Sequence, residues 1–180
     1  MTIQLRPYQQ KMVNEIRVQY QLGKKSVLAV LSTGGGKTCI FSHIAQSAAK
    51  RGNRVCILVH RAELLEQASN SLRRMDVRHG LIAANRSMDL SHAVQVASVQ
   101  TLARRLHKLP RDFFQLLVVD EAHHSNAGTW AKVISHFASA KLLGVTATPI
   151  RGDGRGLGEW YQSMVQGPSS KWLTDNGFLA

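Results

Sequence analysis

The segment VLAVLSTGGGKTCIF (27–41) constrains the fold more strongly than any other part of the sequence. An apolar run passes into three consecutive glycines, then into Lys-Thr and a helical stretch, which is typical of a strand, a tight turn and a helix in succession. Glycines let backbone N–H groups approach a phosphate closely, and the start of a helix adds a favourable dipole. The segment therefore predicts a phosphate-binding loop on an α/β fold.

Each residue of this loop has an expected role. The backbone that would surround the phosphates of ATP comprises Thr33, Gly34, Gly35 and Gly36. Lys37 would reach the β- and γ-phosphates, and the Thr38 hydroxyl would ligate Mg²⁺. The full pattern of such loops has a glycine where this chain has Leu31. The alternative interpretation is a glycine-rich turn that a Lys-Thr pair follows by chance.

Short apolar runs alternate with segments of helical period along the rest of the chain. The runs are rich in Val, Leu and Ile, as expected of strands that are covered on both faces. Strands are expected at 26–32, 54–60, 93–99, 115–122 and 141–148, and helices at 7–22, 37–52 and 62–75. This alternation predicts a three-layer α/β/α domain with a mostly parallel central sheet.

The composition changes after Pro149. Residues 150–160 hold four of the chain's 14 glycines and are expected to form a loop. The ending SSKWLTDNGFLA (169–180) predicts a short helix followed by the start of a strand. We therefore expect one domain over 1–150 and an extension over 151–180.

A second chemical signal is the run QLLVVDEAHH (115–124), in which a buried strand ends in Asp120 and Glu121. Two adjacent carboxylates at the carboxyl end of a strand are costly unless a cation or a reaction needs them. Asp120 would hold Mg²⁺, directly or through water, and Glu121 would orient and deprotonate an attacking water. Because parallel strands end at one edge of a sheet, both groups are expected beside the phosphate loop.

Taken in order, STGGGKT, DEAHH and GVTATP resemble motifs I, II and III of superfamily 2 helicases and translocases. LRPYQ (5–9) resembles the Q motif of that family, HRAELLEQ (60–67) motif Ia and SVQTL (98–102) motif Ib. The resemblance extends from Leu5 to about Pro149 and implies a RecA-like P-loop NTPase domain, the first of two in the family. The ending is most similar to the XPB-like and RadD-like branch, with restriction-enzyme motor subunits as near relatives.

The resemblance implies roles for several further residues. Gln9 would contact the adenine edge, with Arg6 nearby. Thr146 and Thr148 would bond to the Asp-Glu-Ala-His segment and link hydrolysis to movement; the alternative is two capping threonines at a strand end. His123 would face a second domain. A zinc site that combines His123 with His124 is not expected, because no further ligand lies at suitable spacing.

Nucleic acid is the expected partner. The formal net charge is +12, which favours a polyanion. Arg61, Gln100 and Thr101 follow predicted strands and are candidates for contacts with a nucleic-acid backbone, for DNA rather than RNA. Basic clusters at 73–78 and 104–108 are either further contacts or solvated helix faces.

The resemblance implies an ATP-dependent helicase or translocase domain that hydrolyses Mg²⁺·ATP. A second RecA-like domain would supply arginine fingers, so the chain alone is expected to hydrolyse ATP little or not at all. Two alternatives are a nucleotide-gated nucleic-acid-binding module without motor activity and the motor subunit of a restriction system. Nuclease or repair proteins are possible partners. Cys39 and Cys56 are expected to be free thiols, and no membrane-spanning segment is expected, so the predicted location is the cytoplasm.

Overall fold

The computed structural model describes residues 4–122, 127–148 and 160–179. Strands and helices alternate along most of the first two ranges, as the sequence predicts, although the strands at 79–82 and 94–98 follow each other without a helix between them. The helices are α1 (Pro7–Gln21), α2 (Lys37–Lys50), α3 (Ala62–Arg74), α4 (Val99–Arg105), the short 3-10 helix η1 (Leu106–Lys108), α5 (Ala127–His136) and α6 (Ser170–Asp175). The strands are β1 (Ser26–Val30), β2 (Val55–Val59), β3 (His79–Ile82), β4 (Val94–Ser98), β5 (Leu116–Asp120), β6 (Lys141–Thr146) and β7 (Ser163–Gln166).

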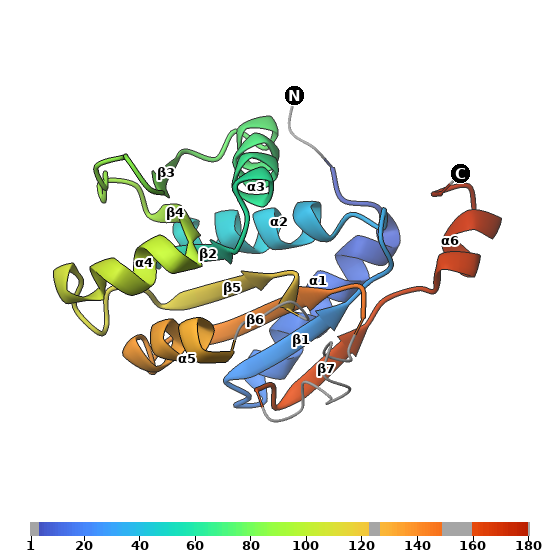
Figure 1. Cartoon of the computed structure of the whole chain (residues 1–180). Helices are drawn as coiled ribbons and strands as arrows, with labels where there is room; N and C mark the ends of the chain where they lie inside the picture. The colour runs from blue at the N-terminus through green and yellow to red at the C-terminus, as the bar shows by residue number, and fades with distance from the viewer. Residues whose placement is uncertain (1–3, 123–126, 149–159, 180) are drawn as a thin grey trace.

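The strands form one sheet in the order β3-β4-β2-β5-β6-β1-β7, and every pairing is parallel. Helices α1, α2 and α3 cover one face, and α4 and α5 cover the other (Figure 1). Each face has its own apolar core, centred on side chains such as Phe41 on the first and Trp130 on the second. The predicted three-layer α/β/α fold with a parallel sheet is therefore confirmed.

The parallel register places the functional segments at one edge of the sheet. Val30, the last residue of β1, lies beside Thr146 of β6, and Val145 lies beside Asp120 of β5. The phosphate loop, the acidic pair and the Thr-Ala-Thr turn consequently follow neighbouring strand ends. This is the edge at which α/β folds bind their ligands.

Two strands were not predicted, and both lie at the lateral edges of the sheet. Among the described residues, β3 pairs with β4 alone and β7 pairs with β1 alone. The predicted domain boundary at residue 150 lies in 149–159, outside the described residues. Beyond it, β7 extends the sheet of the first domain, and Leu173 of α6 is fully buried in its core.

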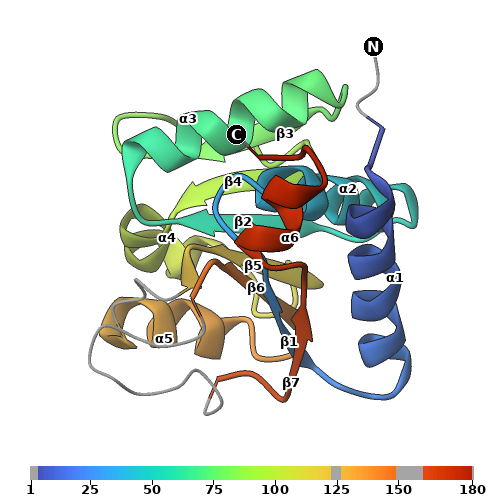
Figure 2. The same cartoon turned by 90° about the vertical axis from the view of Figure 1, so that its right-hand side faces the viewer.

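The strand expected at the end of the chain is wrong. Helix α6 ends at Asp175 and is followed by a turn in which Gly177 adopts a φ of 78°. The backbone N–H groups of Phe178 and Leu179 donate to the Leu173 carbonyl, at 2.8 and 3.2 Å. These bonds turn the ending back over α6 instead of extending it (Figure 2), and the Phe178 ring contacts Arg6 and Tyr8 at the start of α1. In the described part of the chain, no helix is both long and apolar enough to cross a bilayer.

Candidate nucleotide site

The phosphate loop joins β1 to α2 through a tight turn. The N–H of Gly35 donates to the Ser32 carbonyl at 2.9 Å, and Gly34 and Gly36 adopt φ angles of 83° and 92°. These angles lie in the left-handed region, which glycine occupies at little cost. Gly36 also precedes α2 directly and turns the chain into the helix. Gly34 and Gly36 are therefore required by the conformation of this loop, and Gly35 by space, because a Cβ there would overlap Leu31 and the Ser32 carbonyl.

Two side chains of α1 donate hydrogen bonds to the phosphate loop. The Tyr8 hydroxyl donates to the Gly35 carbonyl at 2.7 Å, and Gln9 Nε2 donates to the same oxygen at 3.1 Å. Gln9 Oε1 accepts from the backbone N–H of Arg6 at 2.9 Å. A Cβ atom at Gly36 would overlap the Gln9 amide. Gln9 thus supports the phosphate loop directly, and Tyr8 is a functional candidate that the sequence analysis passed over although it lies within LRPYQ.

Lys37 and Thr38 open helix α2 beside this loop, and both side chains are half-buried. Lys37 Nζ lies 3.4 Å from the Leu31 carbonyl, so the side chain folds back across the loop. Thr33 is exposed at the mouth of the turn. The lysine and threonine therefore flank the space that the glycine backbone surrounds.

The acidic pair lies at the end of β5. Asp120 is only 7 % exposed, and Glu121, which is half-buried, adopts a φ of 54°. A left-handed backbone at a residue other than glycine, aspartate or asparagine is uncommon and costs about 1–3 kcal/mol. Such strain at the end of a buried strand is frequent in active sites.

The electrostatics of Asp120 connect the two motifs. Burial, with a smaller contribution from the negative charge of Glu121, raises the pKa of Asp120 from 3.8 to about 6. The backbone N–H of Glu121 and the ammonium of Lys37 both lower this pKa. Lys37 and Asp120 therefore share one electrostatic environment, although they lie on different strand–helix units.

These residues fit Mg²⁺ and a triphosphate. Asp120 forms no ion pair within the described ranges, so its buried charge is available to a cation. Magnesium commonly takes one or two protein oxygens and completes its shell with phosphate and water. Asp120 and Thr38 would supply such oxygens, while Lys37 and the N-terminus of α2 would meet the phosphates.

The Thr-Ala-Thr turn is compact. Thr146 is fully buried; its hydroxyl donates to the Thr148 carbonyl at 2.8 Å and accepts from the Thr148 N–H at 3.1 Å. The turn therefore has the internal bonds of a capped strand end, and it also lies beside Asp120 through the β5–β6 register. His123, expected to face a second domain, and His124 lie outside the described residues.

The candidates for nucleic-acid contacts lie after β2 and β4. Arg61 is exposed and immediately precedes α3. Gln100 is exposed, and its Nε2 lies 3.3 Å from the His60 carbonyl, which connects the two segments. Thr101 is 8 % exposed, which leaves its side chain little surface for a ligand. The structure thus brings Arg61 and Gln100 together on the surface, whereas the Thr101 side chain is buried beside them.

A cluster of aromatic side chains from the C-terminal segment lies on the Q-motif residues, and nothing in the local sequence indicated it. The Arg6 guanidinium lies 5.0 Å from the centre of the Phe178 ring, and the Tyr8 and Phe178 rings meet edge to face at 5.1 Å. Trp172 stacks on Phe178, and Leu179 occupies the space above Gly34. The end of the chain therefore touches the phosphate loop and both residues that flank Pro7.

The sheet order, the phosphate loop and the acidic pair together define a RecA-like P-loop NTPase domain of the superfamily 2 type. The family model described as "Type III restriction enzyme, res subunit" (ResIII) matches residues 2–151. The chain belongs to this family. The resemblance to the first RecA-like domain of superfamily 2 proteins is thereby confirmed.

Individual relatives agree with this assignment. The chain is 33% identical to "Putative ATP-dependent helicase IRC3" of Saccharomyces cerevisiae over 98% of its own length and 29% of that protein. It is 31% identical to "DNA 3'-5' translocase XPB2" of Sulfurisphaera tokodaii over 85% of its length and 33% of that protein. The UvsW helicase of bacteriophage T4 shares the fold, with a TM-score of 0.75 at 18% identity, over 91% of this chain and 60% of that one. The chain thus spans about a third of the curated relatives.

Proposed function

We propose that this chain is the ATP-binding domain of an ATP-dependent nucleic-acid motor, a helicase or translocase. The observation that carries the proposal is that the glycine loop with Lys37 and the buried Asp120 follow strand ends that the β1–β6 and β5–β6 registers bring to one edge of the sheet. A phosphate-binding lysine and a buried, unpaired carboxylate at one strand edge are what hydrolysis of a magnesium–nucleotide complex needs. The names of the relatives, an ATP-dependent helicase and a DNA translocase, support the same activity.

The residues would divide the chemistry as follows. The backbone of the glycine loop and Lys37 would bind the β- and γ-phosphates, and Thr38 and Asp120 would hold Mg²⁺. The bound ion would neutralise charge that develops on the phosphates during hydrolysis. Glu121 would accept a proton from the attacking water and orient it. Gln9 and Arg6 would lie near the adenine of the bound ATP. Thr146 and Thr148 would link hydrolysis at the site to movement on the nucleic acid.

A second RecA-like domain is proposed to complete the site in the full protein, with residues 151–180 leading toward it. An arginine finger from such a domain is worth roughly 10³- to 10⁵-fold in rate. The 180-residue chain alone is therefore proposed to bind Mg²⁺·ATP and to hydrolyse it slowly or not at all. His123, together with the Thr-Ala-Thr turn, would face the incoming domain.

The proposed polymer is nucleic acid, DNA rather than RNA, held by its backbone through Arg61 and Gln100. The net charge of +12 supports a polyanion, and the exposed positions of both side chains after neighbouring strands support a continuous track. A nuclease or repair partner is proposed on the family's description, which names a restriction enzyme. A cytoplasmic location is proposed because Cys39 and Cys56 are both free thiols.

Calorimetry with Mg²⁺·ATP tests the proposal on the chain itself. Wild type is expected to bind, and Lys37→Ala is expected to bind about 10- to 100-fold more weakly, since hydrogen bonds to charged groups contribute about 1.5–3 kcal/mol. Lys24→Ala is the matched control, because Lys24 is exposed in the turn before β1. Absence of ATP binding by wild type would contradict the proposal. Rapid turnover by the chain alone would contradict the need for a second domain.

A further inference from the structure

An open cleft of about 660 Å³ runs along the free edge of β3, far from the phosphate loop. Its walls are the end of α3, the strand β3 and the loop 83–93 that returns to β4. The charged side chains that line it include Arg73, Arg78, Arg86, Asp76 and Asp89. We call this hollow the basic cleft.

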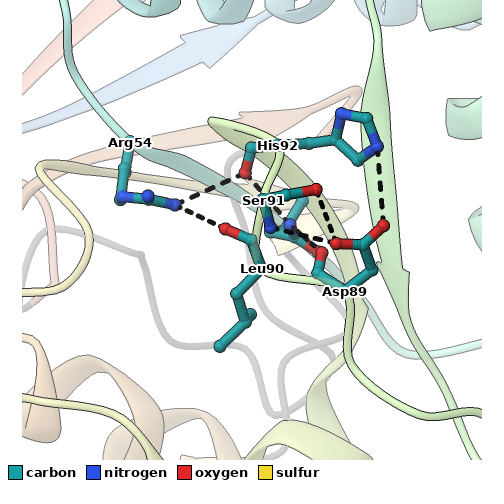
Figure 3. Close-up of polar contacts among 6 residues, drawn as sticks. Arg54, Asp89, Leu90, Ser91 and His92 are labelled. Atoms are coloured by element: carbon teal, nitrogen blue, oxygen red, sulfur yellow. Dashed lines mark hydrogen bonds and ion pairs between the residues drawn. The ribbon is translucent and has the colours of Figure 1, made fainter.

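The loop that forms one wall is held in place by side chains from the body of the domain. Arg54 Nη1 donates to the carbonyls of Leu90 and His92, at 2.9 and 3.5 Å (Figure 3). The fully buried Gln95 donates to the carbonyls of Asp89 and His92, at 2.8 and 3.1 Å. The cleft is therefore a preformed feature and does not depend on a freely moving loop.

Further contacts of Arg105 and Arg54 support this wall. The Arg105 guanidinium donates to the Arg86 carbonyl at 3.0 Å and to the Ala83 carbonyl at 3.4 Å. Arg54 itself lies 4.6 Å from the centre of the Phe113 ring. Arg54 and Arg105 donate hydrogen bonds to backbone carbonyls and so support the wall. The arginines that would contact a ligand are therefore others.

The arginines that face the cleft have few partners. Arg73, Arg78 and Arg86 are exposed, and none of them forms an ion pair in the described ranges. Arg73 donates to the side chain of Asn70 at 3.0 Å. Guanidinium groups match phosphate oxygens in charge and in geometry. Three of them on one cleft therefore offer several phosphate contacts.

The acidic groups of the cleft are partly committed. Asp89 accepts from the N–H and the hydroxyl of Ser91, at 3.1 and 2.6 Å, and lies 3.7 Å from His92 Nε2 (Figure 3). The Ser91 bonds lower the pKa of Asp89, so it serves as a charged anchor of the loop. Asp76 follows α3 and is the remaining carboxylate of the cleft. His79 bonds to Ser69 and to the Val77 carbonyl and holds the start of β3.

The position of the cleft continues the proposed nucleic-acid track. Arg61 follows β2 and Gln100 follows β4, while Arg86 lies in the loop after β3, and these three strands are neighbours in the sheet. A nucleic-acid strand that contacts Arg61 and Gln100 and continues toward β3 therefore reaches Arg86 next. The four residues of β3 span about 13 Å, which is long enough for two or three successive phosphates of one nucleic-acid strand.

We propose that the basic cleft binds the phosphodiester backbone of a nucleic-acid strand, as an extension of the motor's footprint around the edge of the sheet. The proposal deepens the proposed function and depends on its nucleic-acid ligand, though not on ATP hydrolysis. The contacts are to backbone phosphates, so binding is independent of base sequence. The arginines also have a simpler explanation, in which they only prevent the free edge of β3 from pairing with another chain.

Fluorescence anisotropy with a labelled single-stranded DNA, measured across a series of salt concentrations, tests the cleft. The double variant Arg78→Ala/Arg86→Ala is expected to reduce the slope of log affinity against log salt by about 1.4, at about 0.7 for each lost contact. The matched control Lys24→Ala/Arg111→Ala removes the same two charges at exposed positions away from the cleft and is expected to keep the slope. Unfolding midpoints of all four arginine and lysine changes verify that the fold is intact.

The other outcomes overturn the proposal in distinguishable ways. If the wild type and the double variant have equal slopes of log affinity against log salt, the cleft does not bind nucleic acid, and the proposed function is unaffected. No DNA binding by wild type would remove both the cleft and the nucleic-acid part of the proposed function. Self-association of the double variant with unchanged DNA binding would assign the arginines to edge protection. If polyglutamate displaces DNA at an equal concentration of charge, the ligand of the cleft is an acidic protein segment and not nucleic acid.

Discussion

The phosphate loop and the basic cleft both suit phosphate groups, but they lie near opposite lateral ends of the sheet and are built differently. The loop presents backbone N–H groups, whose direction is set by the left-handed angles of Gly34 and Gly36. The cleft presents exposed guanidinium groups on a wall that the half-buried Arg54 and the buried Gln95 hold in place. A backbone site fixes one phosphate group in one geometry, whereas long side chains accept a polymer in several registers.

This contrast predicts that the loop is far less tolerant of substitution than the cleft. Gly36→Ala places a Cβ against the Gln9 amide at a φ of 92°, so the free energy of unfolding is expected to fall by about 2–3 kcal/mol. Arg86→Ala is expected to change it by less than about 0.5 kcal/mol. Urea unfolding of both variants measures the difference. Equal effects would mean that the glycine angles do not constrain the loop.

The two sites are also expected to respond differently to pH. The pKa of Asp120 is raised to about 6 in the folded chain, so this carboxyl favours its protonated form on folding. The contribution of Asp120 to folding stability is therefore fully present below about pH 4, the ordinary pKa of an aspartate. It is lost as the pH rises through the folded-state pKa of about 6. Asp120→Asn is consequently expected to stabilise the ligand-free chain at pH 8 by about 1–2 kcal/mol.

The same titration governs the metal. A protonated Asp120 cannot ligate Mg²⁺, so the magnesium dependence of ATP binding is expected to weaken between pH 7 and pH 5.5. Arginines keep their charge over this range, and therefore DNA binding at the cleft is expected to persist. Calorimetry and anisotropy on the same sample compare the two. A parallel decline of both affinities would show that the titration acts on the fold and not on one site.

A smaller effect than at Gly36 or Asp120 is expected at the aromatic cluster. Phe178→Leu keeps an apolar side chain but removes the ring that faces Arg6 and Tyr8. The loss is expected to be about 0.5–1.5 kcal/mol of stability, with a weaker contact on the phosphate loop. Phe113→Leu is a matched control, because it removes a similar arginine contact on the other side of the domain. ATP affinity is expected to change only in the first variant.

The sequence predicted the central strands because their environment leaves a clear pattern. Strands β1, β2 and β5 are buried along their whole length, which requires continuous apolar runs. The edge strands β3 and β7 are short, and their residues alternate or contain Gly, His, Ser and Gln. A strand with one free edge does not need a buried composition, and so it cannot be told from a loop by its residues alone.

The nucleotide site was predictable for a related reason. Glycines with positive φ and paired carboxylates are costly unless a function requires them, so they stand out in a sequence. The support of the loop by Tyr8 and Gln9, and the contact of Phe178 with Arg6, depend on packing between distant segments. No local pattern records such packing. The basic cleft was visible only as scattered arginines, since its walls come from three separate segments.

The stacking of Trp172 on Phe178 has a practical consequence. Trp172 is 43% exposed and lies in the chain's ending, whereas Trp130, which is 1% exposed, and Trp160, which is half-buried, both pack in the opposite layer. The Trp172 indole is therefore the one whose polarity changes if the chain's ending shifts when a nucleotide enters beside Arg6. Because all three tryptophans of the chain emit, the difference between the wild type and Trp172→Phe isolates this intrinsic optical signal for occupancy, without any attached dye.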